Sequence, residues 1–75
     1  MNDASPATVF DGKAFVRDLT TAPGVYRMYA SDDSVLYVGK ALSLKKRVAS
    51  YFLSTVSSPR IAVMIKQIAR MEITI

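Results

Sequence analysis

Apolar positions near the start of this 75-residue chain follow the spacing of a helix. Asp11 can cap the helix start, and Phe10 before the cap can reach Phe15 at the fourth helical position. Phe15 and Leu19 lie one turn apart and continue an apolar stripe. Because Pro23-Gly24 breaks helical structure, the pattern predicts a first helix that ends before this pair.

Two short runs rich in β-branched and aromatic residues come next. Val25 to Tyr29 and Val35 to Val38 are each typical of a strand. The residues between them, Ser31-Asp32-Asp33-Ser34, have the chemistry of a turn. The pattern therefore predicts an antiparallel hairpin, with Gly39 ending its second strand.

The second half of the chain predicts two more helices and a strand. Ser43 can cap a second helix, and Ser58-Pro59 is a strong start for a third one. Apolar residues at helical spacing follow each start: Leu44, Val48, Tyr51 and Phe52 in the second helix, and Ile61, Met64, Ile65 and Ile68 in the third. Alternation over Glu72 to Ile75 predicts a final strand.

The predicted order of helix, strand, strand, helix, helix, strand indicates an α+β fold. Helices should pack on a small, mostly antiparallel three-stranded sheet. We expect residues 1–9 to form a loose N-terminal tail and residues 10–75 to form one domain. Because the last strand begins where the chain stops, we expect the domain to be truncated at its C-terminus.

Composition excludes several classes of protein. The chain has no cysteine and no histidine, which excludes disulfides, zinc fingers and a histidine general base. It contains neither a secretory signal nor an apolar run of membrane-spanning length, so we expect a cytoplasmic protein with no membrane partner.

Positive charge is concentrated in the second half of the chain. Residues 1–39 hold three basic and five acidic residues, for a charge of −2, whereas residues 40–75 hold seven basic and one acidic residue, for +6. A basic segment of this kind suits a polyanionic partner such as nucleic acid. On charge alone, an ordinary solvated basic face is an equal alternative.

The candidate chemistry lies around Gly24-Val25-Tyr26 and Tyr37-Val38-Gly39. If the hairpin pairs Tyr26 with Tyr37 or Gly39, both tyrosine side chains point to the same face, and a slip of one residue separates them. Gly39 allows the backbone to lie close to a ligand. Lys40 and the start of the second helix suit a phosphate, and Arg47 lies one helical turn before Tyr51. This combination indicates a phosphodiester site.

The two tripeptides resemble the pair of motifs that names the GIY-YIG nucleases. The longer pattern, with Leu44-Lys45-Lys46-Arg47 and Ser50-Tyr51-Phe52, resembles the UvrC branch of that family and extends the resemblance over residues 10–75. The resemblance implies that Tyr37 helps to deprotonate the attacking water and Tyr26 positions that water. Arg47 then stabilises the charged transition state, while Lys40 and Tyr51 support the site and hold the scissile phosphate. The implied DNA-binding positions are Gly39, Lys40, Lys45 and Lys46.

The resemblance also implies one divalent metal ion, Mg2+ or Mn2+, held by a glutamate on a later helix. The only glutamate here, Glu72, does not match that position. We therefore expect this chain to lack its metal ligand, to bind no metal by itself and to be inactive alone. A second departure is Ala41-Leu42-Ser43, where UvrC sequences carry lysine and then asparagine or aspartate. Leu42 thus removes one basic contact and should weaken DNA binding slightly.

By resemblance, the whole protein is an endonuclease of nucleotide excision repair, part of the SOS response to DNA damage, which cuts on the 3′ side of a lesion. Its expected partners are damaged double-stranded DNA and the damage-loading subunit UvrB, which binds segments outside this chain. One alternative is a non-catalytic DNA-binding module of the same fold. Another, a stand-alone GIY-YIG nuclease, is disfavoured by the UvrC-type pattern.

The candidate residues have structural alternatives as well. Tyr26, Tyr29 and Tyr37 fit half-buried strand positions, which is the favoured interpretation for Tyr29 alone. Tyr51 suits the core and the site about equally, because it shares a stripe with Val48. The following basic residues are expected on the solvated face of the third helix: Arg60, Lys66 and Arg70.

Overall fold

The computed structural model describes residues 10–53 and 58–75, and the tail expected over residues 1–9 lies outside them. The described elements follow the predicted order, and their bounds are α1 Gly12–Arg17, β1 Gly24–Tyr29, β2 Val35–Ala41, α2 Leu44–Phe52, α3 Pro59–Gln67 and β3 Arg70–Thr74. The predicted α+β class is therefore confirmed.

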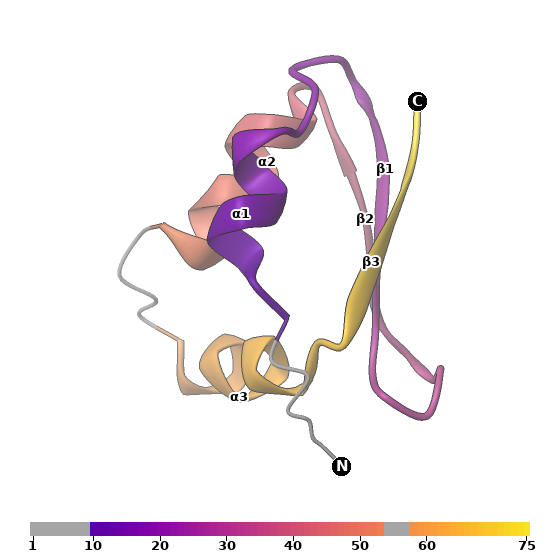
Figure 1. Cartoon of the computed structure of the whole chain (residues 1–75), viewed down its shortest axis with the longest axis vertical. Coiled ribbons are helices and arrows are strands. Elements are labelled where there is room, and N and C mark those ends of the chain that lie inside the picture. The colour runs from indigo at the N-terminus through magenta and orange to yellow at the C-terminus, as the bar shows by residue number, and fades with distance from the viewer. Residues whose placement is uncertain (1–9, 54–57) are drawn as a thin grey trace, which may run out of the picture.

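The three strands form one antiparallel sheet in the order β2-β1-β3. The hairpin of β1 and β2 comes first in the chain, and β3 returns along the other edge of β1 (Figure 1). All three described helices lie on the same side of this sheet, with α1 and α2 next to each other and α3 at the end nearer the hairpin turn (Figure 1). The sheet therefore has an inner face covered by helices and an outer face.

Side-chain caps start all three described helices where the sequence predicts them. Asp11 accepts a hydrogen bond from the Ala14 amide at 3.1 Å, and the rings of Phe10 and Phe15 lie 5.5 Å apart as the expected hydrophobic staple. Ser43 and Ser58 cap α2 and α3 in the same way. These local signals depend only on neighbouring residues, which explains why the sequence located them well.

The first helix is shorter than its apolar stripe suggested. It ends at Arg17, and Asp18 forms its C-cap, so Leu19 lies beyond the helix. Val16, which the stripe did not include, is the buried residue of α1 that enters the core. The buried face of the helix is therefore centred on Val16, next to the face that the spacing of Phe15 and Leu19 predicted.

Two strand boundaries differ from the predicted ones by two residues or more. Gly39 does not end β2, because the strand stays paired with β1 as far as Ala41 opposite Gly24. β3 begins at Arg70, which was expected on the third helix; α3 ends at Gln67 and the backbone turns extended at Ile68. In both cases hydrogen bonding to β1 extends a strand past the point where local propensity stops favouring it.

The core lies between the helices and the inner face of the sheet. Tyr26 and Met28 alternate inward along β1, and the side chains opposite them on β3 are Ile73 and Met71. The buried hydrophobic residues are Val16, Tyr26, Met28, Leu44, Val48, Ile68 and Met71. Within residues 10–53 and 58–75, no helix is long and apolar enough to cross a membrane.

Candidate functional site

The hairpin register brings the two motif tyrosines together on the inner face. Tyr26 lies opposite Gly39, and Met28 lies opposite Tyr37, so all four residues belong to the same face. The ring centroids of Tyr26 and Tyr37 are 6.0 Å apart. The register that would place both tyrosines on one face is thus the one observed.

A third tyrosine joins them from α2. The hydroxyl of Tyr51 lies 3.0 Å from the hydroxyl of Tyr26, and the two rings meet edge to face with centroids 6.0 Å apart. Tyr51 is half-buried and packs against the core. The core interpretation and the site interpretation of Tyr51 are therefore compatible. A residue of the second helix therefore completes a tyrosine cluster on the sheet.

Gly39 makes room for this cluster. A Cβ at this position would lie 2.4 Å from both the Cζ and the hydroxyl oxygen of Tyr26. The ring of Tyr26 thus occupies the space that a side chain would take. The glycine thus allows close packing against a neighbouring aromatic ring, a role that the sequence did not suggest.

The two motif tyrosines differ sharply in their surroundings. Tyr26 is 2% exposed, whereas Tyr37 is 41% exposed. Burial, followed by the hydrogen bond with Tyr51, raises the pKa of Tyr26 well above the usual tyrosine range, and the positive charge of Arg47 opposes that rise in pKa only weakly. Tyr26 is therefore a permanently neutral hydroxyl at neutral pH, while Tyr37 is the tyrosine of the pair that solvent reaches.

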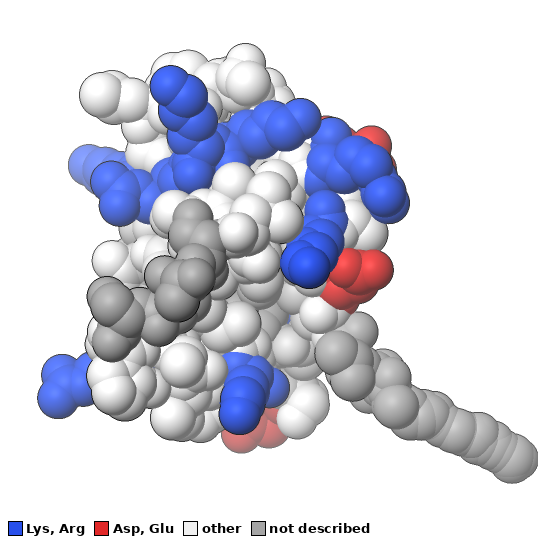
Figure 2. All heavy atoms as spheres, turned by 90° about the vertical axis from the view of Figure 1, so that its left-hand side faces the viewer, with Lys and Arg blue, Asp and Glu red and all other residues white. Residues whose placement is uncertain are grey.

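The start of α2 presents three consecutive basic residues. Because successive helical residues are rotated by about 100°, Lys45, Lys46 and Arg47 fan out around the helix. Lys45 points toward α1, where its ammonium group donates a hydrogen bond to the carbonyl of Arg17 at 3.1 Å. Lys46 and Arg47 are exposed. On the side of the molecule formed by the helices, Figure 2 shows Lys and Arg side chains gathered in a band over α2 and α1.

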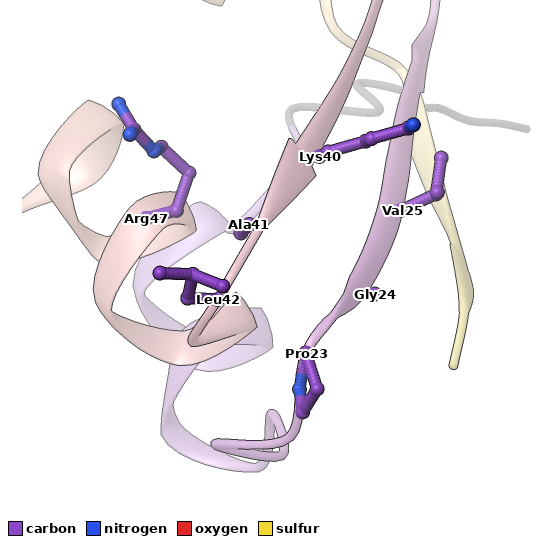
Figure 3. A pocket seen from close by; sticks show the side chains of 7 residues that line it. All are labelled: Pro23, Gly24, Val25, Lys40, Ala41, Leu42 and Arg47. Carbon is purple, nitrogen blue, oxygen red and sulfur yellow. The ribbon is translucent and has the colours of Figure 1, made fainter.

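A hollow of about 480 Å³ lies between the start of β1, the end of β2 and α2. Its lining residues are Pro23, Gly24, Val25, Lys40, Ala41, Leu42 and Arg47. In Figure 3, Arg47 extends from α2 and Lys40 extends from β2 across β1 toward Val25. The hollow thus has one cationic side chain from the helix and one from the sheet.

A second hollow of about 410 Å³ adjoins the first along the loop that joins β2 to α2. The two hollows share Ala41, Leu42 and Arg47, and the second adds Lys46 and Ser50 from α2. Leu42 separates them and is 93% exposed. Arg47 therefore borders both spaces, and an apolar side chain stands where related sequences were expected to carry lysine.

The predicted site residues divide into three groups in the structure. Tyr26, Tyr37 and Tyr51 form one cluster, with Gly39 packed against it. Lys40 lies opposite Val25 in the sheet, so its side chain leaves the face opposite to that of the tyrosines and reaches the first hollow from there. The basic residues of α2 form the third group: Arg47 lies near enough for its charge to act on Tyr26, whereas Lys45 turns toward α1.

The described residues contain no cluster of metal-ligating side chains. Within residues 10–53 and 58–75 there is no group of three histidine, cysteine, aspartate or glutamate side chains that could hold a metal ion. Glu72 lies opposite Arg27, on the outer face, and is hydrogen bonded to Tyr29 and Arg70. A carboxylate on the outer face cannot serve a metal at the tyrosine cluster. Hard cations need oxygen ligands of this kind, so this part of the chain does not fit one.

A polar network on the outer face was not anticipated from the sequence. The guanidinium group of Arg70 stacks on the Tyr29 ring at 4.0 Å and forms ion pairs with Asp33 and Glu72. Tyr29 is half-buried, as its strand interpretation suggested. Arg70 became part of this network because it lies in β3 opposite Tyr29, and only the strand pairing reveals that neighbour.

A three-stranded antiparallel sheet with helices on one face and a motif tyrosine on each strand of its hairpin is consistent with a nuclease domain of the GIY-YIG type. The sequence model of the UvrC-like GIY-YIG domain matches residues 22–75. The chain therefore belongs to the UvrC-like GIY-YIG family.

Individual relatives agree with this assignment. The chain is 60% identical over 72 residues to UvrABC system protein C of Xanthomonas campestris pv. campestris (strain B100), and 58% identical over 72 residues to that of Xanthomonas oryzae pv. oryzae (strain PXO99A). Each match covers 96% of this chain. Over 75 residues, all of the chain, it is 59% identical to UvrABC system protein C of Xylella fastidiosa (strain M23). The chain spans 12% of the length of each of these relatives.

Proposed function

We propose that this chain supplies catalytic residues of a DNA endonuclease domain that hydrolyses one phosphodiester bond of a damaged strand. In the whole protein, this reaction is the 3′ incision of nucleotide excision repair. The observation that carries the proposal is the pairing of an exposed tyrosine, Tyr37, with a buried neutral one, Tyr26, close enough to Arg47 for its positive charge to act on the Tyr26 hydroxyl. The relatives named UvrABC system protein C support the same activity.

The proposed roles follow from exposure and charge. Tyr37 is the accessible hydroxyl, and its proposed role is to help to deprotonate the attacking water. Tyr26 keeps its own proton, because burial and Tyr51 hold its pKa high, and it positions the water as a neutral hydrogen-bonding group. A buried hydroxyl beside an accessible one is a suitable arrangement for aligning a water molecule at the exposed edge of the pair.

Arg47 and Lys40 are proposed to hold the phosphate. Both border the first hollow, from the helix side and from the sheet side respectively. Phosphoryl transfer builds negative charge on the non-bridging oxygens, and a guanidinium group placed beforehand stabilises that charge more strongly in a protein site than in water. Arg47 is therefore the proposed transition-state residue, and Lys40 and Tyr51 support phosphate binding.

The divalent ion expected from the sequence, Mg2+ or Mn2+, remains part of the proposal with its ligands outside the described residues. When bound, such an ion supplies positive charge to the phosphate oxygens. Damaged duplex DNA is the proposed substrate, and UvrB the proposed partner, through other segments of the protein. A cytoplasmic setting is proposed for the same reaction.

A nicking assay tests the proposal. Lesion-bearing duplex is incubated with the whole protein, its repair partners and Mg2+ or Mn2+, with a chelator as the metal-free arm. We expect nicks on the 3′ side of the lesion, and we expect Tyr37→Phe and Arg47→Ala to remove them while DNA binding largely remains. Arg60→Ala, which removes an exposed positive charge from α3, is the matched control and should still cut.

The competing function is a DNA-binding module without catalysis, which the basic residues of α2 favour. It predicts that no variant and no metal condition yields nicks. It also predicts that affinity falls stepwise as Lys45, Lys46 and Arg47 are neutralised, because each one would contribute a phosphate contact and nothing more. Cutting by the parent protein that Arg47→Ala abolishes rules this function out.

A further inference from the structure

The first helix carries two basic side chains on one side. Lys13 and Arg17 are four residues apart, so they lie one above the other on the surface of α1, and both are exposed. Neither belongs to the tyrosine motifs or to the basic segment of the sequence. They come from residues 1–39, where acidic residues outnumber basic ones.

Folding joins the C-terminal end of α1 to the basic start of α2. The Lys45 ammonium group donates to the Arg17 carbonyl at 3.1 Å, and the amide of Lys45 donates to the carbonyl of Thr20 at 3.0 Å. The ring of Phe10, just before α1, also packs 5.8 Å from that of Phe52 at the end of α2. The two helices are thus held together at both ends of their contact.

The basic side chains of the two helices lie on neighbouring elements as a result. Lys46 and Arg47 line the second hollow, Lys45 contacts the end of α1, and Arg17 and Lys13 follow on α1; we call these five residues the α1–α2 basic band. On the helical side of the molecule, Figure 2 shows Lys and Arg side chains gathered across its upper part, with acidic side chains beside them at one end. The band therefore includes Arg47 of the proposed cutting site and extends onto α1.

The extent of the band suits an elongated polyanion. Packed helices have axes about 8–10 Å apart, so two helices with their side chains present a surface roughly 20 Å wide. That width corresponds to about half of a B-DNA turn of roughly 34 Å. A small anion would need several cations converging on one point, whereas here the positive charges are spread along a ridge.

We propose that α1 is part of the DNA interface. Lys13 and Arg17, together with Lys45, contact backbone phosphates of the DNA duplex. These phosphates flank the scissile bond, on the part of the duplex that lies over α1. The contacts are independent of base sequence and set the direction in which the duplex leaves the site. This inference rests on the proposed function, because that function places the scissile phosphate beside Arg47.

The test measures how DNA affinity depends on salt. The double variant Lys13→Gln/Arg17→Gln is compared in the whole protein with the matched double variant Arg60→Gln/Lys66→Gln on α3, using undamaged and lesion-bearing duplexes. Each lost phosphate contact lowers the slope of log affinity against log salt by about 0.9, so the α1 variant should lose roughly 1.8. Between 50 and 200 mM salt, the parent protein should then lose about 12-fold more affinity than the α1 variant.

The charge-conserving variant Lys13→Arg/Arg17→Lys separates charge from folding, because it should restore the slope of the parent protein. An unchanged slope in Lys13→Gln/Arg17→Gln overturns the proposal, as does an equal loss in the α3 control. The slope of log affinity against log salt also tests the α1 interface independently of DNA cutting. If the parent never cuts DNA, the nuclease proposal fails, yet a slope that depends on Lys13 and Arg17 still supports an interface on α1.

Discussion

Replacing Gly39 with alanine should destabilise the protein through the ring of Tyr26. A Cβ at position 39 would lie 2.4 Å from the Cζ and hydroxyl oxygen of Tyr26. Ordinary contacts of a Cβ begin at 3.4 Å, so the ring must shift by about 1 Å. The hydroxyl cannot follow freely, because it is hydrogen bonded to Tyr51 at 3.0 Å and the ring is 2% exposed.

The cost has two parts. Overpacking a well-filled core typically costs about 1–3 kcal/mol, and a lost or distorted hydrogen bond adds about 0.5–1.5 kcal/mol. We therefore expect Gly39→Ala to lower the free energy of unfolding by about 1.5–4.5 kcal/mol. A domain of this size has roughly 4–11 kcal/mol of stability in total, so the variant should lose a large share of it and show a clearly lowered melting temperature.

A double-mutant cycle, measured by urea unfolding, isolates the contact. Tyr26→Leu removes the Cζ and hydroxyl atoms that the new Cβ would meet and keeps an apolar side chain in the core. In that background, Gly39→Ala should cost less than about 0.5 kcal/mol, because its clashing partner is gone. Val38→Ala serves as the control, since Val38 neighbours Gly39 on the opposite face and is half exposed.

Two results would refute this reasoning. If Gly39→Ala alone changes the free energy of unfolding by less than about 0.5 kcal/mol, the tyrosine ring is not confined as described. If the alanine costs the same amount in the parent and in the Tyr26→Leu background, the loss comes from the strand backbone and not from the ring. Either result would also weaken the case for Tyr26 as a rigidly held member of the site.

Three further predictions concern the pKa of Tyr26, the core and a cap. Because the folded-state pKa of Tyr26 is raised, its contribution to stability is complete below about pH 10 and is lost as pH rises above it. Alkaline ultraviolet titration and urea unfolding should show that Tyr26→Phe removes this pH dependence. An unchanged slope of the free energy of unfolding against pH would contradict the prediction. Leu44→Ala should cost about 2–5 kcal/mol in urea unfolding because Leu44 is fully buried, whereas the exposed Leu42→Ala should cost almost nothing. Asp11→Ala should cost about 1 kcal/mol by the same measurement, while Asp11→Asn, which retains a capping oxygen, should be nearly neutral.

The element order and the helix starts were predictable because their causes are local. Asp11, Ser43 and Ser58 cap helices through amides three residues further along the chain, so nothing distant is needed to recognise them. Strand ends were less predictable. Gly39 and Arg70 were assigned outside strands on local propensity, whereas pairing with β1 brings both into the sheet.

The sequence proposed the members of the candidate site but not their geometry. Through the family resemblance it named Tyr26, Tyr37, Arg47 and Tyr51, and the structure brings the three tyrosines together. The sequence could not show that Tyr26 is buried while Tyr37 is accessible, because that difference depends on which strand the helices cover. The separation of Lys40 onto the opposite face likewise follows from the register of the hairpin.

The sequence by itself determined which elements form, where their helices begin and which family the motifs resemble, since each of these depends on neighbours within a few residues. Tertiary structure alone decided which distant groups meet. The hydroxyls of Tyr26 and Tyr51 come from positions 25 residues apart, and Lys45 reaches the carbonyl of Arg17 across 28 residues. Those contacts exist because burying apolar surface packs α1 and α2 side by side against the sheet, and no local pattern encodes the position of one helix relative to another.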